Sequence, residues 1–442
     1  MSNCSGIKEN ISTKVKRREQ LNESNWINKS VAYTKWVAPC RNCGRNDLRL
    51  LWKLPDSPLG DHYRLEKDKA SQEELFSHSI ADCESCGLLQ LGEEPPIRDQ
   101  YDNYLYKTSN TFGLGEYYKE LANNISTKFL RSGDLVIDIG GNEGLLLKHF
   151  MHLGAKVLLI DPAPAAREAA ENGIETMNVY FSEDLAETLM ISIGQKAKVV
   201  TINYTLANIP NLDSLFSGIL KVLEDDGIVS IITGYHPEQF QVNMIDYAGH
   251  DHLTFFSFEV LTNILERHGL KAIDVSRLEH KGGSIHVLAA RSESSYETSH
   301  RTLMMGQREE WIWPNNILGI EKVRTRVEEQ KTRVRRKLEK LAASKLKVFG
   351  VGASISTTYL INLFGIQEFI DFLVDDDINK IGRFSPMHSI EVKSFAMIQG
   401  HNIDTAMILS WQHTKVLTRR LRQSGFNGEV IIPLPELRSI HL

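Results

Sequence analysis

Four of the five cysteines fall into two CxxC pairs, Cys40–Cys43 and Cys83–Cys86, and a glycine follows each pair. A CxxC turn directs two thiolates at one ion, and the glycine permits the tight turn that points backbone N–H groups at sulfur. Two such turns complete a closed tetrahedral site, which is structural because no ligand position stays open for a substrate. The duplicated pattern therefore predicts zinc at these four positions rather than buried or redox-active thiols.

A glycine-rich turn, DIGGNEG at residues 138–144, follows a short apolar run. Glycines between a strand and a helix let a ligand approach the backbone N–H groups at the start of the helix. The leading Asp138 suits a cationic ligand group such as the amino group of S-adenosylmethionine, whereas a dinucleotide turn would have the form GxGxxG without that acid. Asp161, about twenty residues later, can accept hydrogen bonds from ribose hydroxyls. A plain Rossmann turn or an NAD site is the alternative.

The sequence GHDH at residues 249–252 places two histidines on either side of an acid. A metal site is disfavoured, because His250 and His252 would diverge on a strand and no third ligand is evident nearby. We favour a catalytic histidine held by its neighbour, since imidazole titrates near neutral pH. Structural histidines that cap the next helix are the alternative.

Two series of alternating strands and helices position these motifs. The first has strands at 135–139, 156–161, 199–203 and 227–233 and helices at 145–153, 165–172 and 212–222. This alternation is typical of a doubly wound, mostly parallel sheet. A second alternation begins at Lys347, after a long helix over 315–345 with one apolar stripe. Its first turn, from Gly350 to Ser354, either helps to hold a diphosphate or only packs strand on helix.

The predicted fold class is therefore α/β: a small zinc-binding N-terminal domain, a doubly wound Rossmann-like domain and a second, smaller Rossmann-like α/β domain. The expected segments are a flexible tail (1–30), the zinc-binding domain (31–100), the cofactor domain (101–291), a helical linker (292–345) and the C-terminal domain (346–442).

Composition excludes several classes of protein. The chain has 442 residues, of which 42% are hydrophobic, so it can bury sizeable cores. A net charge of −5 argues against nucleic acid as a partner. No apolar run reaches the roughly 18 residues of a membrane span, and the first thirty residues contain no signal-peptide core. We expect a cytoplasmic protein, and the sequence leaves its oligomeric state open.

Together these motifs resemble those of the nucleotide-sugar C-methyltransferases of deoxysugar pathways. The resemblance runs from about Cys40 to Leu434 and rests on the two knuckles, DIGGNEGLLLKHF, GIETMNVYFSEDLA, HDHLTFFS, HGLKAIDVSRLEHKGGSIHVLAAR, FGVGAS and LVDDDINKIGRFSPMHSIEV. It implies zinc-binding, methyltransferase and C-terminal Rossmann-like domains. It also implies S-adenosylmethionine and structural zinc as cofactors, and a nucleotide-activated keto-deoxysugar as the small-molecule substrate.

The resemblance also implies roles for individual residues. His252 matches the base that removes a proton beside a 4-keto group, and Asp251 and His250 match its neighbours. The implied cofactor-binding residues are Asp138, Gly140, Asn142, Gly144, Asp161, Pro162, Phe181 and Asn203. The implied substrate-binding residues are Tyr104, Tyr106, Asn208, Ser284, Gly352 and Ser354.

Four positions depart from the family pattern, and all belong to the sugar-binding part. Gly249 stands where the family has a tyrosine, Asn208 replaces a histidine, and His286 replaces an arginine. In the stretch that the family writes Tyr-x-Tyr-x-Ser-Ser, Thr108 replaces the first serine. A carbon becomes a nucleophile only when a base removes its proton and another group stabilises the enolate. Other supports must therefore act here. The alternatives are O- or N-methylation of a related glycan precursor, and a non-catalytic protein that binds cofactor or nucleotide sugar.

Overall fold

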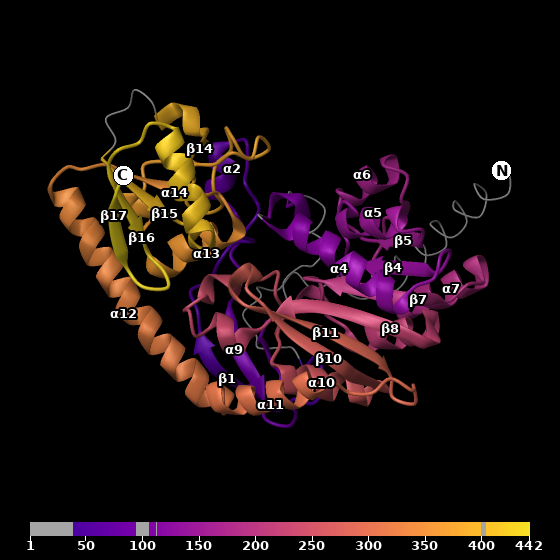
Figure 1. Cartoon of the computed structure of the whole chain (residues 1–442). Coiled ribbons are helices and arrows are strands. Elements are labelled where there is room, and N and C mark those ends of the chain that lie inside the picture. Colours follow the sequence, from indigo (N-terminus) through magenta and orange to yellow (C-terminus); the bar gives the residue numbers. More distant parts are fainter. Residues whose placement is uncertain (1–38, 94–105, 112, 399–403) are drawn as a thin grey trace.

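The chain builds three sheets, which Figure 1 shows in a computed structural model. The structure describes residues 39–93, 106–111, 113–398 and 404–442. The predicted tail over 1–30 lies outside these residues, as does Tyr104. Among the described residues, no helix combines the length and the apolar character that crossing a membrane requires.

The first sheet carries the cysteine pairs and is antiparallel, in the order β1-β2-β3-β9. Its strands are β1 (Leu48–Lys53), β2 (Ser79–Cys83), β3 (Leu89–Leu91) and β9 (Thr254–Phe255). The fourth strand is distant in sequence: Leu89 pairs with Phe255 and Gln90 with Thr254. Because β9 begins two residues after His252, the histidine segment is anchored to the sheet of the cysteine pairs.

The second sheet has seven strands in the order β10-β11-β8-β7-β4-β5-β6, and all run parallel except β11, which is antiparallel to both of its neighbours. Its strands are β4 (Leu135–Ile139), β5 (Lys156–Ile160), β6 (Glu175–Met177), β7 (Ala197–Asn203), β8 (Leu223–Gly234), β10 (Leu270–Leu278) and β11 (Ser284–Arg291). β4 is buried along its whole length, as parallel strands covered on both faces require. The expected doubly wound sheet is confirmed. The strands β6, β10 and β11 were not predicted.

Helices pack against this sheet and fix its loops. They are α4 (Leu114–Phe129), α5 (Leu145–His152), α6 (Ala166–Glu171), α7 (Glu183–Ile193), α8 (Leu212–Val222), α9 (His236–Gln239) and α10 (Phe258–Arg267). Short 3-10 turns connect them: η1 (Thr108–Asn110), η2 (Leu206–Asn208), η3 (Ile245–Tyr247) and η4 (His280–Gly282). Side chains cap several helices; Ser182, Asn211 and Ser257 each accept a backbone N–H at the start of α7, α8 and α10.

The third sheet has the order β14-β13-β12-β15-β16-β17, parallel except for β17. Its strands are β12 (Val348–Val351), β13 (Leu373–Val374), β14 (Val392–Lys393), β15 (Thr405–Ile408), β16 (Glu429–Ile432) and β17 (Arg438–His441). The helices of this part are α13 (Ile355–Phe364), η5 (Gln367–Phe369), η6 (Phe395–Ile398), η7 (Trp411–His413) and α14 (Thr414–Gln423). The predicted second α/β unit is therefore present.

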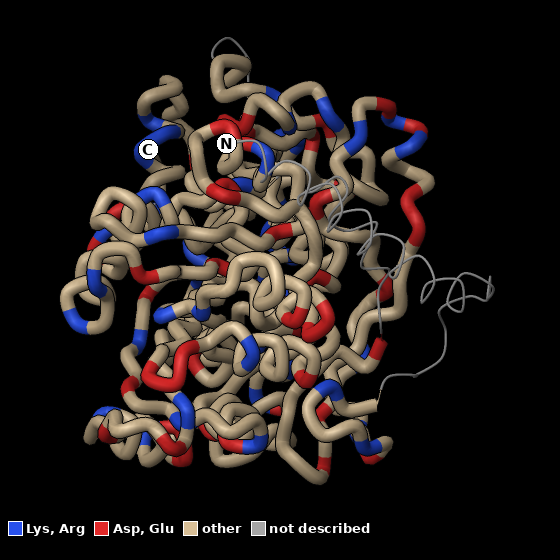
Figure 2. The backbone as a smooth tube through the Cα atoms, turned by 90° about the vertical axis from the view of Figure 1, so that its right-hand side faces the viewer, with Lys and Arg blue, Asp and Glu red and all other residues tan. Residues whose placement is uncertain are grey.

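Two helices connect the second and third sheets. α11 (His300–Ile312) leads into α12 (Asn316–Ala343), which runs along the outside of the molecule in Figure 1. The apolar stripe predicted for the long helix is buried; its members are Ile320, Val323, Val327, Val334, Leu338 and Leu341. Figure 2 shows lysines, arginines and acids interspersed along the chain, without one broad basic surface in that view.

The segment between β1 and β2 reaches from the cysteine pairs to the C-terminal domain. It contains α2 (Lys67–Ser71), which lies near β14 in Figure 1. Backbone hydrogen bonds join Arg64 to Phe384 and Met387 to Ala70. Lys380 Nζ lies 2.6 Å from Asp61 Oδ1, and both side chains are buried. A buried ion pair is costly to break, so this contact holds the two parts together.

Candidate active site

The four paired cysteines converge. Cys40 Sγ lies 3.4 Å from Cys86 Sγ, and Cys43 Sγ lies 3.5 Å from Cys83 Sγ. All four sulfur atoms lie within 4.8 Å of one another. Thiolates about 2.3 Å from a tetrahedral Zn²⁺ lie about 3.8 Å apart, so the cluster has the dimensions of a zinc site. The glycines after the two pairs have φ of 69° and 73°, as the tight turns require.

The glycine-rich turn after β4 adopts a conformation that larger residues could not share. Gly140 and Asn142 have φ of 75° and 54°. A Cβ on Gly140 would lie 2.3 Å from Thr205 Cγ2, and a Cβ on Gly141 would lie 2.2 Å from Asp138 Oδ2. The backbone of the turn thus packs directly on Asp138 and Thr205, and the N–H groups of Gly140 and Asn142 donate to the Ile160 carbonyl and to Asp161 Oδ2.

Three buried acids surround this turn. Asp138, Glu143 and Asp161 are exposed by 2%, 3% and 5%. Burial raises the pKa of Asp138 to about 7, although the Thr201 hydroxyl donates to it at 2.6 Å, and burial raises the pKa of Asp161 to about 6. A nearby positive charge stabilises carboxylates whose pKa burial has raised towards neutral pH, so these groups favour a cationic ligand. They disfavour the negatively charged diphosphate of a dinucleotide.

Two polar side chains border the turn on the neighbouring strands. The carboxylate oxygens of Asp161 accept the backbone N–H groups of Asn142 and Ala163, each at 2.7 Å. Asn203, the last residue of β7, is buried, and neither atom of its amide has a hydrogen-bond partner among the described residues. Unused donors and acceptors in a buried position fit a polar ligand. Phe181 is half-buried and packs beside α8, next to this edge of the sheet.

The carboxyl ends of β4, β5 and β7 therefore bring most of the predicted cofactor residues together. These are Asp138, Gly140, Asn142, Gly144, Asp161, Pro162 and Asn203.

His252 lies between an aromatic ring and a carboxylate. It is buried, and its ring stacks on Tyr247 with centroids 3.8 Å apart. Its Nδ1 lies 3.5 Å from Asp251 Oδ2. Burial lowers the pKa of His252; the Asp251 carboxylate opposes this shift, and the Lys281 ammonium adds to it. The imidazole is therefore neutral at neutral pH, which is the form that accepts a proton.

Short contacts connect His252 with the glycine-rich turn. The Thr205 hydroxyl donates to the Gly140 carbonyl at 3.1 Å. The backbone N–H of Leu253 donates to the Ala207 carbonyl at 2.7 Å. The short turn η2, which starts next to Thr205, thus lies between the cofactor residues and His252.

His250 is engaged on both ring nitrogens. Its Nε2 lies 3.1 Å from the Ser77 carbonyl, and its Nδ1 lies 3.3 Å from the Tyr359 hydroxyl. The same hydroxyl accepts the His250 backbone N–H at 2.9 Å. His250 thus joins the zinc-binding part to α13 of the C-terminal domain.

Gly249 leaves the space that the Tyr359 ring occupies. A Cβ at position 249 would lie 2.2 Å from Tyr359 Cε2 and 2.7 Å from Asp251 Oδ1. A larger residue at this position therefore excludes Tyr359 from its present place. The C-terminal domain thus supplies an aromatic hydroxyl beside position 249, where the resemblance described above led us to expect a tyrosine.

The predicted substrate-binding residues occupy two sheet edges. Tyr106 and Ser284 lie near the second sheet; the Tyr106 carbonyl accepts from Asn142 Nδ2 at 3.3 Å, and the buried Ser284 hydroxyl donates to the His280 carbonyl at 2.9 Å. Asn208 ends η2. In the third sheet, Gly352 and Ser354 follow β12, and the Ser354 hydroxyl caps α13 and lies 3.0 Å from Ser410 Oγ.

Four residues near His252 were not assigned from the sequence: Tyr204, Tyr247, Lys281 and Tyr359. Tyr204 and Lys281 have φ of 56° and 51°, which is uncommon for residues other than glycine. Tyr204 directly follows an apolar strand, and Lys281 precedes two glycines, so both positions offered a signal. No local pattern points to Tyr247 or Tyr359, because their roles depend on contacts between distant segments.

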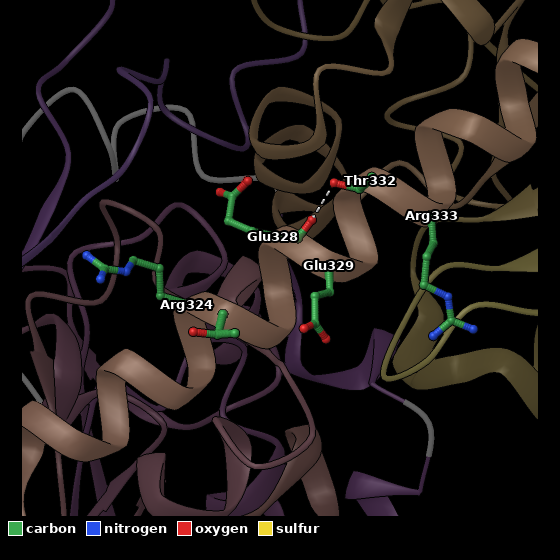
Figure 3. Close-up of a pocket in the computed structure, with 6 residues that line it drawn as sticks. Arg324, Glu328, Glu329, Thr332 and Arg333 are labelled. Atoms are coloured by element: carbon green, nitrogen blue, oxygen red, sulfur yellow. Dashed lines mark hydrogen bonds between the residues drawn. The ribbon is translucent and has the colours of Figure 1, made fainter.

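A separate hollow lies along α12, as Figure 3 shows. Its lining is Arg324, Thr325, Glu328, Glu329, Thr332 and Arg333. None of these is a predicted site residue, and the hollow belongs to the polar face of the helix.

Three family models match consecutive parts of the chain. They are described as "Putative zinc binding domain" (residues 40–101), "Methyltransferase domain" (113–275) and "C-methyltransferase C-terminal domain" (279–435). The C-methyltransferase NovU of Streptomyces niveus is 28% identical over 410 residues, which are 91% of this chain and 97% of NovU. The chain is therefore an S-adenosylmethionine-dependent methyltransferase that contains these three domains.

Other methyltransferases match part of the chain. The demethylmenaquinone methyltransferase of Lactobacillus johnsonii is 22% identical over 220 residues, covering 43% of this chain and 87% of that protein. The magnesium protoporphyrin IX methyltransferase of Synechocystis, solved with S-adenosylhomocysteine, has a TM-score of 0.34 at 16% identity, covering 44% of this chain and 91% of that one.

The C-methyltransferase uses S-adenosylmethionine, and its four-cysteine cluster is the zinc site. The buried acids and the unpartnered Asn203 amide fit the cationic, polar cofactor, which supplies the methyl group when bound. The closed set of four thiolates fits structural zinc.

We expect protein purified without added metal to contain about one zinc per chain. Cys40→Ser and Cys83→Ser each remove one of four ligands, so zinc content and the midpoint of thermal unfolding should both fall. Elemental analysis and thermal unfolding measure these effects, with Cys4→Ser as the control because Cys4 belongs to neither pair. Zinc-free protein, with both variants as stable as the parent, would contradict the assignment.

Asp161→Ala should weaken binding of S-adenosylhomocysteine by about 1–3 kcal/mol, because the variant loses a charged acceptor and the support of the Asn142 N–H. Calorimetry measures the change. Asp225→Ala is the control, since the Asp225 side chain is 92% exposed. Unchanged affinity in Asp161→Ala, or comparable binding of NAD by the parent, argues against the site.

Gly249→Ala should destabilise the protein by about 1–3 kcal/mol, because the added methyl group overlaps the Tyr359 ring. The cost should shrink when Tyr359→Leu is already present. Denaturant unfolding of the parent, both single variants and the double variant gives the coupling between the two positions. Additive effects would show that Tyr359 is not what position 249 accommodates.

Proposed function

We propose that this enzyme transfers a methyl group to a carbon of a nucleotide-activated keto-deoxysugar, with His252 as general base. The observation that carries the proposal is the neutral, buried imidazole beside Asp251, joined through η2 to the glycine-rich turn. Methylation of carbon needs such a base, because the carbon becomes a nucleophile only after it loses a proton. Oxygen and nitrogen are already nucleophilic, so methyl transfer to them depends less on a base.

In the proposed reaction His252 removes the proton from the carbon next to the ketone. Burial keeps the imidazole neutral before this step, and the Asp251 carboxylate, 3.5 Å from Nδ1, stabilises the imidazolium that results. Tyr247 fixes the plane of the ring by stacking. The carbon then bonds to the methyl group that S-adenosylmethionine supplies.

His250 has a positioning role in this proposal. Because both of its ring nitrogens are engaged by Ser77 and Tyr359, it holds the segment that carries Asp251 and His252.

The C-terminal residues Gly352 and Ser354 are proposed to contact the nucleotide part, since they follow the first strand of a parallel sheet. The setting is cytoplasmic, the substrate is a small molecule, and nucleic acid is not a partner of a chain with net charge −5.

His252→Asn should abolish exchange of the proton next to the ketone, with a loss on the order of a hundredfold or more. The parent and the variant are incubated in heavy water with S-adenosylhomocysteine and a panel of nucleoside-diphosphate keto-deoxysugars, and NMR follows the exchange. Binding of S-adenosylhomocysteine should be unchanged. His300→Asn is the matched control, because His300 is exposed at the start of α11.

Labelled S-adenosylmethionine then locates the transferred methyl group. Label on oxygen or nitrogen overturns carbon transfer, and native-rate transfer by His252→Asn removes His252 from the role of base. The parent's kcat/KM should fall as pH decreases through the pKa of His252. Since burial lowers that pKa, the midpoint should lie below 6.5.

A further inference from the structure

The backbone of Lys281 adopts a left-handed conformation that is unfavourable for residues other than glycine. It lies in η4, between β10 and β11, with φ of 51°. Its carbonyl accepts a hydrogen bond from Gln239 Nε2 at 3.0 Å. A Cβ on the next residue, Gly282, would lie 2.0 Å from Met244 Sδ, so the turn is packed tightly against its surroundings. A non-glycine residue kept in this region by its neighbours often marks a functional position.

The ammonium group of Lys281 lies over two tyrosine rings. Its Nζ is 4.2 Å from the centroid of Tyr204 and 5.1 Å from that of Tyr106. Among the described residues, no ion pair includes Lys281. Aromatic faces attract a cation without neutralising it, so the charge stays available for an anionic group.

Both tyrosines belong to segments that hold the cofactor turn. Tyr204 directly follows β7, and the next residue, Thr205, contacts the Gly140 carbonyl. Tyr106 accepts the Asn142 amide through its own carbonyl. Lys281 therefore reaches the same edge of the sheet as the residues that hold S-adenosylmethionine.

The base lies close enough to sense this cation. The charge of Lys281 lowers the pKa of His252, after the larger effect of burial and against the opposing effect of Asp251. It also lowers the pKa of His413, at the end of η7 in the C-terminal domain. The ammonium thus lies between the methyltransferase edge and the C-terminal domain.

We propose that Lys281 is a catalytic residue that stabilises the enolate oxygen formed when His252 removes the neighbouring proton. This inference rests on the proposed function. The C–H bond breaks, its proton goes to the imidazole, and its electron pair moves into the carbonyl, whose oxygen becomes negative beside the ammonium. The C–C bond then forms as the C–S bond breaks, sulfur keeps that electron pair, and the ketone is restored.

Lys281 also supplies a stabilising group for the enolate, which the family's tyrosine and histidine cannot supply here because Gly249 and Asn208 replace them. A side chain that stabilises the developing oxyanion is needed once the family's tyrosine and histidine are absent. Lys281 supplies a full positive charge from a different strand connection. The negative charge on the oxygen develops in the transition state of proton removal, and the ammonium stabilises it most there. Removing the ammonium should therefore lower kcat more than it raises KM.

The test compares Lys281→Met, Lys281→Arg and the parent in the heavy-water exchange assay and in methyl transfer. The substrate is the panel member that the parent methylates. Lys345→Met is a matched control, because Lys345 also has a positive φ, 58°, but is exposed in a turn after α12. Thermal unfolding and binding of S-adenosylhomocysteine check that each variant folds.

We expect Lys281→Met to lose on the order of a hundredfold or more in exchange and in kcat, as when an oxyanion-stabilising donor is removed. Lys281→Arg should retain more activity, because it keeps the charge. NMR titration should show a higher pKa of His252 in Lys281→Met, since a nearby positive charge is gone. If the parent transfers methyl groups but does not exchange the proton, the variants are compared with the parent by kcat instead.

Native exchange and kcat in Lys281→Met would overturn the inference. A raised KM with unchanged kcat would also overturn it. That result would mean that the ammonium binds the diphosphate of the substrate and does not stabilise the enolate. A parent that neither exchanges the proton nor transfers methyl groups to any panel member fails at the proposed function instead, so the two failures are distinguishable.

Discussion

The segment from Tyr247 to Thr254 is held by all three parts of the molecule, and the geometry of the site depends on that constraint. Its end continues into β9, which pairs with β3 in the sheet of the zinc-binding part. Leu253 donates to Ala207 of the methyltransferase domain, and Tyr359 of the C-terminal domain contacts His250 on two atoms. The His78 ring of the zinc-binding part contacts the Ala248 carbonyl. A base on a loop would otherwise lack the fixed position that proton transfer requires.

This arrangement gives the zinc a role in placing His252 without any contact between them. The metal closes the turns next to β2 and β3, and β3 in turn fixes β9 and the residues before it. A site with four protein ligands has no chemistry of its own to offer a substrate, but it contributes folding energy to this small sheet.

The sequence was sufficient for features that depend on local spacing. The cysteine pairs, the glycine-rich turn and the α12 stripe follow from periods of a few residues, and the structure contains all three. The short strands β9 and β14 were not predictable, because two residues carry no period and pair only through tertiary contacts. For the same reason Tyr359 was missed. Nothing within the sequence of α13 indicates that its hydroxyl meets His250, about a hundred residues away in the chain.

Three residues with positive φ other than glycine border the site: Asn142, Tyr204 and Lys281. Each belongs to a different strand connection, and contacts made by Tyr106 and Lys281 link the three connections. Asn142 donates to the Tyr106 carbonyl, and the Tyr106 and Tyr204 rings lie beneath the Lys281 ammonium. An unfavourable backbone conformation costs of order 1–3 kcal/mol and persists only where the surroundings impose it. Because Tyr106 contacts both Asn142 and Lys281, and Lys281 also contacts Tyr204, the loops around the cofactor turn are joined to one another. A substitution in one connection should therefore disturb the other two.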